Sequence, residues 1–236
     1  MKARILRIQV AAPLARLLIA HSLPRFIQSR PGLRIHLTEF DSTAAAPGLA
    51  RDTDAAICIG PVPDTHLRTQ RIGTVRSVTC ASPDFIDRHG NPRVPGELQP
   101  GSCIGILASD GSAREWVFRS GRAKHAISPA APVAFGDSAL AIAAAVRGGG
   151  YVRVPGIEVD REIGAGLLEP VLADWSDASA VSIAWAAEVP ASNDLSAFAA
   201  FVARLFPIEQ AEGTPLKASR PYFSTIGTGL GPAWST

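Results

Sequence analysis

Residues Ala56–Leu67 read AICIGPVPDTHL, and this stretch decides how the first part of the chain is interpreted. An apolar run stops at Gly60-Pro61, and a loop punctuated by prolines follows it. A short run that is apolar throughout is typical of a strand covered on both faces, as in a parallel α/β sheet. Because Gly-Pro also ends strands for no functional reason, the loop is interpreted either as plain punctuation or as the lip of a ligand cleft.

The elements before this run alternate between strand and helix. Arg4–Val10 and Leu33–Phe40 alternate apolar and polar residues as strands do, and Pro13 opens a helix between them. Pro24 is expected to kink that helix or divide it in two. With a short helix or turn expected near Leu49–Arg51, the order of elements predicts a doubly wound α/β fold.

The middle of the chain predicts a second α/β unit. Arg76–Ala81 and Val181–Ala186 read as strands that cross between the two units, which gives two Rossmann-like lobes joined by two crossover strands. Ser82 and Ser192 are expected to cap helices that follow them. The predicted boundaries are 1–78 and 182–208 for lobe I, 79–181 for lobe II, and 209–236 for a flexible C-terminal tail.

Composition excludes several classes of protein. The 236 residues are 47% hydrophobic and carry a formal net charge of +2, with scattered arginines and no clustered basic stripe of the kind that binds nucleic acid. No apolar run approaches the ~20 residues that span a bilayer. We therefore expect a cytoplasmic chain without a membrane partner. The three cysteines, Cys58, Cys80 and Cys103, lie in apolar runs and are expected to be buried thiols.

Catalytic and metal-binding patterns are missing from the sequence. The five histidines show no metal-ligand spacing with acids or cysteines, and no G-x-S-x-G elbow is present. Ser138 is therefore interpreted as a helix cap rather than a nucleophile, and Gly148–Gly150 as a helix end rather than a phosphate loop. We expect no enzyme activity, no cofactor and no metal.

Several segments in this order resemble one family. They include RPGLRIHL from Arg30, CASPDFIDRHG from Cys80 and GDSALAIAAAVRGGGYVRVP from Gly136. The chain resembles the effector-binding (regulatory) domain of LysR-type transcriptional regulators from roughly Ile5 to Phe206. The resemblance implies the type 2 periplasmic-binding-protein fold, a homodimer or tetramer, and DNA binding only through a helix-turn-helix that this sequence does not contain.

The ends of the strands locate the expected effector site, because ligands of open α/β sheets lie beyond the carboxyl ends of strands. Helices starting at Pro13 and Ser138 favour an anionic effector, and an aromatic one is also considered. Arg153 is interpreted either as a partner of that ligand or as a surface or interlobe salt-bridge residue, and both interpretations stay open. The predicted effector-binding residues are Ala12, Pro13, Ser42, Gly60, Pro61, Ile106, Phe135, Asp137, Ser138 and Arg153.

Three hypotheses for the function follow. The first is a small-molecule sensor domain of a LysR-type regulator, in which an effector between the lobes shifts the geometry of an oligomer and so controls transcription. The second is a free-standing cytosolic solute-binding protein of the same fold. The third is an enzyme on that fold with Asp137 or His66 as acid–base groups, against which stands the absence of a second catalytic partner.

Overall fold

The chain begins with a small parallel sheet. β1 (Arg4–Ala11) lies between β2 (Leu33–Phe40) and β3 (Ala55–Ile59). In the register, Ala11 pairs with Phe40 and Val10 with Ile57, so all three strands end at one edge, as the alternating pattern predicts. The computed structural model describes residues 4–15, 20–40, 49, 52–62, 66–108, 110–188 and 191–206.

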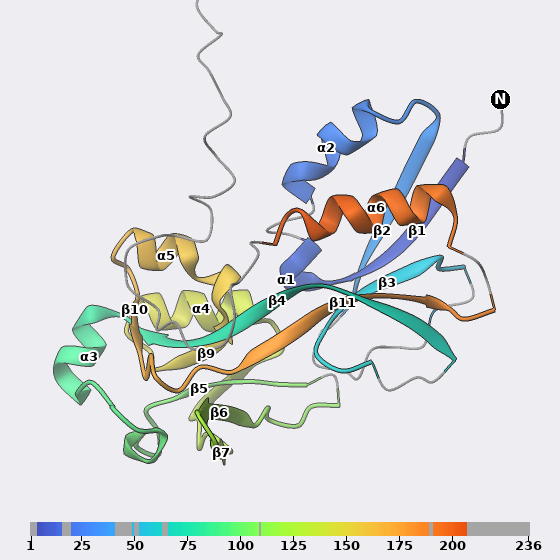
Figure 1. Cartoon of the computed structure of the whole chain (residues 1–236). Coiled ribbons are helices and arrows are strands. Elements are labelled where there is room, and N and C mark those ends of the chain that lie inside the picture. The colour runs from blue at the N-terminus through green and yellow to red at the C-terminus, as the bar shows by residue number, and fades with distance from the viewer. Residues whose placement is uncertain are drawn as a thin grey trace, which may run out of the picture.

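Two helices from opposite ends of the chain, α2 (Ala20–Gln28) and α6 (Asn193–Ala203), lie side by side over this sheet (Figure 1). The ring of Phe26 stacks on Phe201 with centroids 4.7 Å apart and meets the edge of Phe198 at 5.7 Å. Each such side chain contributes about 1.5–3 kcal/mol when it is fully buried. The beginning and the end of the described chain therefore share one hydrophobic core.

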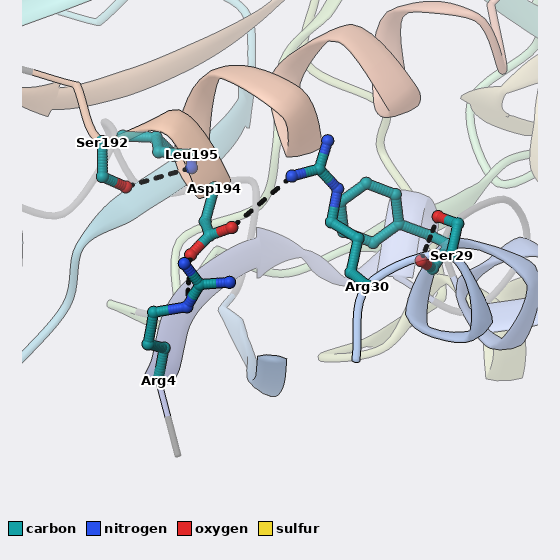
Figure 2. A network of polar contacts seen from close by, with 7 residues as sticks. Arg4, Ser29, Arg30, Ser192, Asp194 and Leu195 are labelled. Carbon is teal, nitrogen blue, oxygen red and sulfur yellow. Dashed lines mark hydrogen bonds and ion pairs between the residues drawn. The ribbon is translucent and has the colours of Figure 1, made fainter. Parts of the chain in front are cut away.

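A polar network fixes the start of α6 to the first strand (Figure 2). Ser192 caps the helix, because its hydroxyl accepts a hydrogen bond of 3.1 Å from the Leu195 N–H. Asp194 follows in the first turn, where a carboxylate complements the helix dipole. Its two oxygens lie 3.2 Å from Arg4 Nε and 3.5 Å from Arg30 Nη1. One carboxylate thus joins β1, the turn before β2 and the last helix.

The helix boundaries agree with the sequence in part. Ser82 caps α3 (Pro83–His89) as predicted, accepting a hydrogen bond from the Phe85 N–H. Pro24 lies inside α2, so a division of the helix at this residue is wrong, and the alternative of a kink stays a prediction. The proline removes one backbone donor, and two residues later Phe26 packs against Phe201 of α6. The expectations for residues 50–51, Ser42 and the 209–236 tail lie outside the described residues.

Two long strands cross the middle of the molecule. β4 (Leu67–Ala81) runs antiparallel to β11 (Ala178–Ala186), which also pairs with β3 (Figure 1). Both strands begin earlier than predicted, because the first residues of β4 are polar and exposed and are held by pairing rather than burial. Ile72 of β4 lies in the core shared by α2 and α6, whereas Cys80 of the same strand lies in a second core.

The second core lies beyond the crossing strands. Its buried side chains come from the far half of β4 and from the helix and strands packed on it, with Ile104, Ala141 and Val152 fully or almost fully buried. The predicted division of the chain at residues 78/79 and 181/182 stays a prediction. The remaining elements are η2 (Pro95–Glu97), β5 (Ile104–Ile106), β8 (Val133–Phe135), α1 (Ala12–Leu14), α4 (Ser138–Val146), β9 (Val152–Pro155), η3 (Gly156–Glu158), α5 (Asp160–Gly164) and β10 (Glu169–Val171).

A β-hairpin formed by β6 (Trp116–Ser120) and β7 (Ala123–Ile127) projects from this second part. The apolar run Trp116-Val117-Phe118 predicts the first strand from the sequence, and the structure buries Trp116 and Phe118. The second was missed, because its residues are almost all exposed and show no apolar alternation. The hairpin matters below because it forms a wall of a cavity.

The three cysteines are buried, as predicted. Burial raises the pKa of Cys58 to about 11; for Cys80, burial together with the nearby Glu162 carboxylate raises the pKa to about 12. Burial also raises the pKa of Cys103. These thiols are therefore protonated at neutral pH and poor nucleophiles. In the described ranges, no helix has the length and apolar character needed to cross a bilayer.

Candidate functional site

A cavity of about 960 Å³ lies against the two crossing strands, and we name it the hinge cavity. Its lining comes from four separate parts of the chain: the loop after β3, the strand β4, the β6–β7 hairpin, and β11 with the residues before it. Such a volume lies in the range of small-molecule sites. The lining residues are Gly60–Val62, Thr69, Arg76, Arg119, Gly121, Ser176–Ala180 and Ser182.

Gly60 explains how β3 ends at the lip of this cavity. Its φ of +90° lies in the left-handed region, which favours glycine. Its N–H donates to the Ala180 carbonyl at 2.8 Å, so the chain stays attached to β11 for one residue beyond the strand. Pro61 then prevents further ladder bonds. The Gly-Pro pair therefore both ends the strand and lines the hinge cavity.

An ion pair spans two walls of the hinge cavity. Nε of Arg119, on the hairpin, lies 3.1 Å from Oδ1 of Asp177, just before β11. The two side chains are 55% and 23% exposed, and an ion pair at this exposure contributes only about 0.2–1 kcal/mol to stability. The Asp177 carbonyl also accepts a 2.8 Å hydrogen bond from the Ser77 N–H. Asp177 is thus attached to β4 through its backbone, and the arginine reaches its carboxylate from the hairpin.

Arg153 contacts the first strand of the hairpin and links it to β4. Its Nη1 donates to the Thr79 hydroxyl at 3.0 Å, its Nη2 donates to the Val117 carbonyl at 2.6 Å, and its guanidinium carbon lies 4.2 Å from the Phe118 ring centre. Desolvation lowers the pKa of Arg153 to about 10, and the charge of Asp177 opposes the shift. Arg153 as a whole is only 9% exposed. Its guanidinium stays protonated at neutral pH, and the residue is not among those that line either cavity described here.

A second cavity, of about 410 Å³, lies beside α4, and we name it the α4 cavity. Its wall is mainly apolar and comes from one side of α4, with Pro13 of α1 and the half-exposed Leu167. Its charged lining residues are Glu158, Glu162 and Arg147. Carboxylates thus outnumber cations here.

The start of α4 differs from the prediction. The N-cap is Asp137 rather than Ser138, because the Asp137 carboxylate accepts a 2.8 Å hydrogen bond from the Ala139 N–H. The Ser138 hydroxyl instead donates to Oε2 of Glu158 at 2.5 Å. Two carboxylates therefore already lie at this helix start, and they would repel a further anion.

The structure brings together only some of the predicted effector-binding residues. Gly60 and Pro61 share the hinge cavity, and Pro13 lies in the α4 cavity. Ile106 pairs with Phe135 in the parallel ladder of β5 and β8, and both pack in the second core. Ala12 follows β1 at the edge where the first three strands end, and Ser42 lies outside the described residues. Their role in effector binding stays a prediction.

Sequence reasoning missed the polar wall of the hinge cavity. Arg119 lies in a hairpin that was only half predicted, and Asp177 lies in a run, Trp175-Ser-Asp-Ala-Ser179, that reads as an ordinary turn before a strand. The available signal was the concentration of small polar residues where a predicted crossover strand begins. The described residues contain no cluster of three or more metal-binding side chains.

Comparison with known proteins identifies relatives among bacterial regulators. The HTH-type transcriptional regulator CrgA of Neisseria meningitidis serogroup C (strain 8013) is 26% identical over 171 residues, which cover 72% of this chain and 56% of the relative. The HTH-type transcriptional activator AaeR of Escherichia coli (strain K12) is 26% identical over 168 residues, covering 71% and 53%. The chain thus spans about half the length of the curated relatives it matches.

Solved structures show the same fold. The CrgA regulatory domain superimposes with a TM-score of 0.70 at 23% identity, covering 86% of this chain and 98% of that chain. Full-length AphB of Vibrio cholerae gives a TM-score of 0.70 at 20% identity, covering 85% and 68%. The predicted type 2 periplasmic-binding-protein-like α/β fold is confirmed. The profile of the LysR substrate binding domain matches residues 2–207, and the chain therefore belongs to that family.

Proposed function

We propose that this chain is the effector-sensing domain of a LysR-type transcriptional regulator and that its effector binds in the hinge cavity. The proposal rests on one observation, namely which parts of the chain supply the residues that line the cavity. The loop Gly60–Val62 comes from the half that contains α2 and α6, Arg119 comes from the other half, and the floor is formed by the strands that join them. A ligand held there contacts both halves at once.

A ligand in this position shifts the equilibrium between conformations that differ in the angle between the two halves. It favours whichever angle between the halves gives it contacts on both walls, and it shifts the equilibrium only by its difference in affinity for the two states. We expect β4 to absorb the change, because it carries buried side chains of both cores and β11 is paired along it. We propose binding without turnover, in a cytoplasmic homodimer or tetramer whose DNA contacts are made by a helix-turn-helix outside these 236 residues.

Differential scanning fluorimetry tests the proposal with a panel of small acids, amino acids, sugars and aromatics. A ligand at a concentration of 100 times its Kd stabilises the folded chain by about 2.7 kcal/mol, which raises Tm by several degrees. Small-angle X-ray scattering with the same ligand should show a smaller radius of gyration. A binder that leaves the radius unchanged and still binds when the hinge cavity is filled would contradict the proposal.

A further inference from the structure

We propose that the effector is an aliphatic hydroxy acid with a single negative charge, and that Arg119 recognises its carboxylate. This inference rests on the proposed function and narrows it to a class of ligand. It depends on three properties of the hinge cavity: the charges on its walls, the kinds of neutral side chain between them, and the contacts of the hairpin that carries Arg119.

The charges favour a monoanion. Two guanidinium groups, of Arg76 and Arg119, and one carboxylate, of Asp177, are the charged side chains among the described lining residues. The formal charges of these described residues sum to +1, and a monocarboxylate has the opposite sign. Arg76 has a further interaction, so the inference assigns the carboxylate of the ligand to Arg119. The α4 cavity has the opposite balance, with two glutamates and one arginine, and is a poor site for the same ligand.

The neutral lining favours hydroxyl groups over aromatic rings. Thr69, Ser176, Ser179 and Ser182 carry hydroxyls that both donate and accept hydrogen bonds. No aromatic side chain is among the described residues of this lining, so a ring would find no stacking partner there. A hydroxylated carbon chain matches this wall, because each of its hydroxyls can exchange hydrogen bonds with a serine or threonine hydroxyl. The inference therefore selects an aliphatic hydroxy acid over an aromatic acid.

Arg119 is positioned to bind a carboxylate without leaving Asp177. Its contact with Asp177 is made through Nε. A guanidinium has two Nη groups besides Nε, and it presents its donors as a fork that matches a carboxylate. The side chain is more than half exposed, so a ligand reaches it with little desolvation. Asp177 then orients the arginine and competes weakly with the ligand for it.

The backbone next to Arg119 is fixed. Val117, two residues before it, accepts the hydrogen bond from Arg153, and Phe118 lies fully buried under the same guanidinium. Arg153 is therefore a positioning residue, which acts on the ligand through the hairpin. A ligand bound to Arg119 and to the loop Gly60–Val62 connects this fixed wall to the other half of the molecule.

Isothermal titration calorimetry with the 236-residue chain tests the inference with matched probes. Gluconate has the charge and the hydroxyls, benzoate has the charge with an aromatic ring, and glucose has hydroxyls without charge. We expect gluconate to bind at least ~10-fold more tightly than the other two. Arg119→Gln should weaken gluconate about 10-fold, and Asp177→Asn should strengthen it about threefold by removing the competing carboxylate.

Arg122→Gln is the matched control, because Arg122 lies on the same hairpin and is exposed but does not line the cavity. It should change gluconate affinity less than twofold. Absence of gluconate binding, tighter binding of benzoate, or equal losses in Arg119→Gln and Arg122→Gln would each overturn the inference. The proposed function would still stand if another ligand bound and were displaced by Ala180→Phe, since that substitution fills the hinge cavity irrespective of ligand class.

Discussion

The hinge cavity and the α4 cavity differ in how the chain builds them. The first is lined by segments between Gly60 and Ser182 that are far apart in the chain and meet beside the antiparallel pair of β4 and β11. The second is lined largely by α4 and the segment Glu158–Leu167 that follows it, with Pro13 as its contact to the start of the chain. The walls of the first therefore come from segments far apart in the chain, and those of the second come largely from one stretch of it. This difference supports our proposal that the hinge cavity is the sensing site.

The polar contacts follow the same division. The walls of the hinge cavity are joined by the exposed pair Arg119–Asp177, which a ligand can disturb at low cost. At the α4 cavity, Glu158 is held by Ser138 and the helix start is already capped by Asp137. A weak contact between separate segments, as at the hinge cavity, suits a sensor because a ligand can replace it. Contacts that complete a helix end, as at the α4 cavity, suit a fixed structural part.

The largest expected effect comes from Arg153→Ala. The substitution leaves the Val117 carbonyl and the Thr79 hydroxyl without their donor and opens a void against Phe118. We expect the free energy of unfolding to fall by about 3 kcal/mol, measured by urea denaturation. Hydrogen exchange should accelerate in the hairpin and remain slow in α4. Equal acceleration in both would show that Arg153 supports the whole second core rather than the hinge cavity wall.

A matched pair of cavity-filling substitutions compares the two sites directly. Ala180→Phe places a ring in the hinge cavity and Ala143→Phe places one in the α4 cavity. We expect the first to lower effector affinity at least ~10-fold and the second to change it less than twofold, measured by calorimetry. Each should alter unfolding free energy by about 0.5 kcal/mol or less, because both rings enter open space. The reverse pattern of affinities would move the effector site to α4.

The smallest effect is expected from Ser138→Ala. Glu158 loses a half-buried hydroxyl donor, so the free energy of unfolding should fall by about 1 kcal/mol in urea denaturation. Affinity for an effector should not change, because Ser138 does not line the hinge cavity. A clear loss of affinity without loss of stability would instead restore Ser138 as a ligand contact, as the sequence suggested.

The sequence predicts the fold well where burial and alternation agree. β1, β2 and β3 were recognised because Leu6, Ile8 and Val10 alternate with polar residues and the β3 run is continuously apolar. The sequence predicts Ser82 and Ser192 as caps, because a hydroxyl at a helix start accepts a hydrogen bond from a backbone N–H three residues later. Local rules thus predict the elements and most of their ends.

The site was predicted less well, because its parts meet only through long-range pairing. Nothing local relates Arg119 to Asp177, which are 58 residues apart and become neighbours through the packing of the hairpin beside β11. The sequence left Arg153 open between a ligand contact and a surface or interlobe salt-bridge residue. Its burial over Phe118 depends on a hairpin of which the sequence predicts only the first strand. Asp137 and Ser138 are adjacent, and only the position of Glu158 decides which of them caps α4.

Hydrogen–deuterium exchange with and without the tightest binder from the panel tests the central claim most directly. The account predicts slower exchange on binding at residues 60–62, 117–121 and 176–182, the segments that line the hinge cavity, with exchange in α4 unchanged. Slower exchange confined to residues 138–147 and 158–167, with none around the hinge cavity, would contradict it.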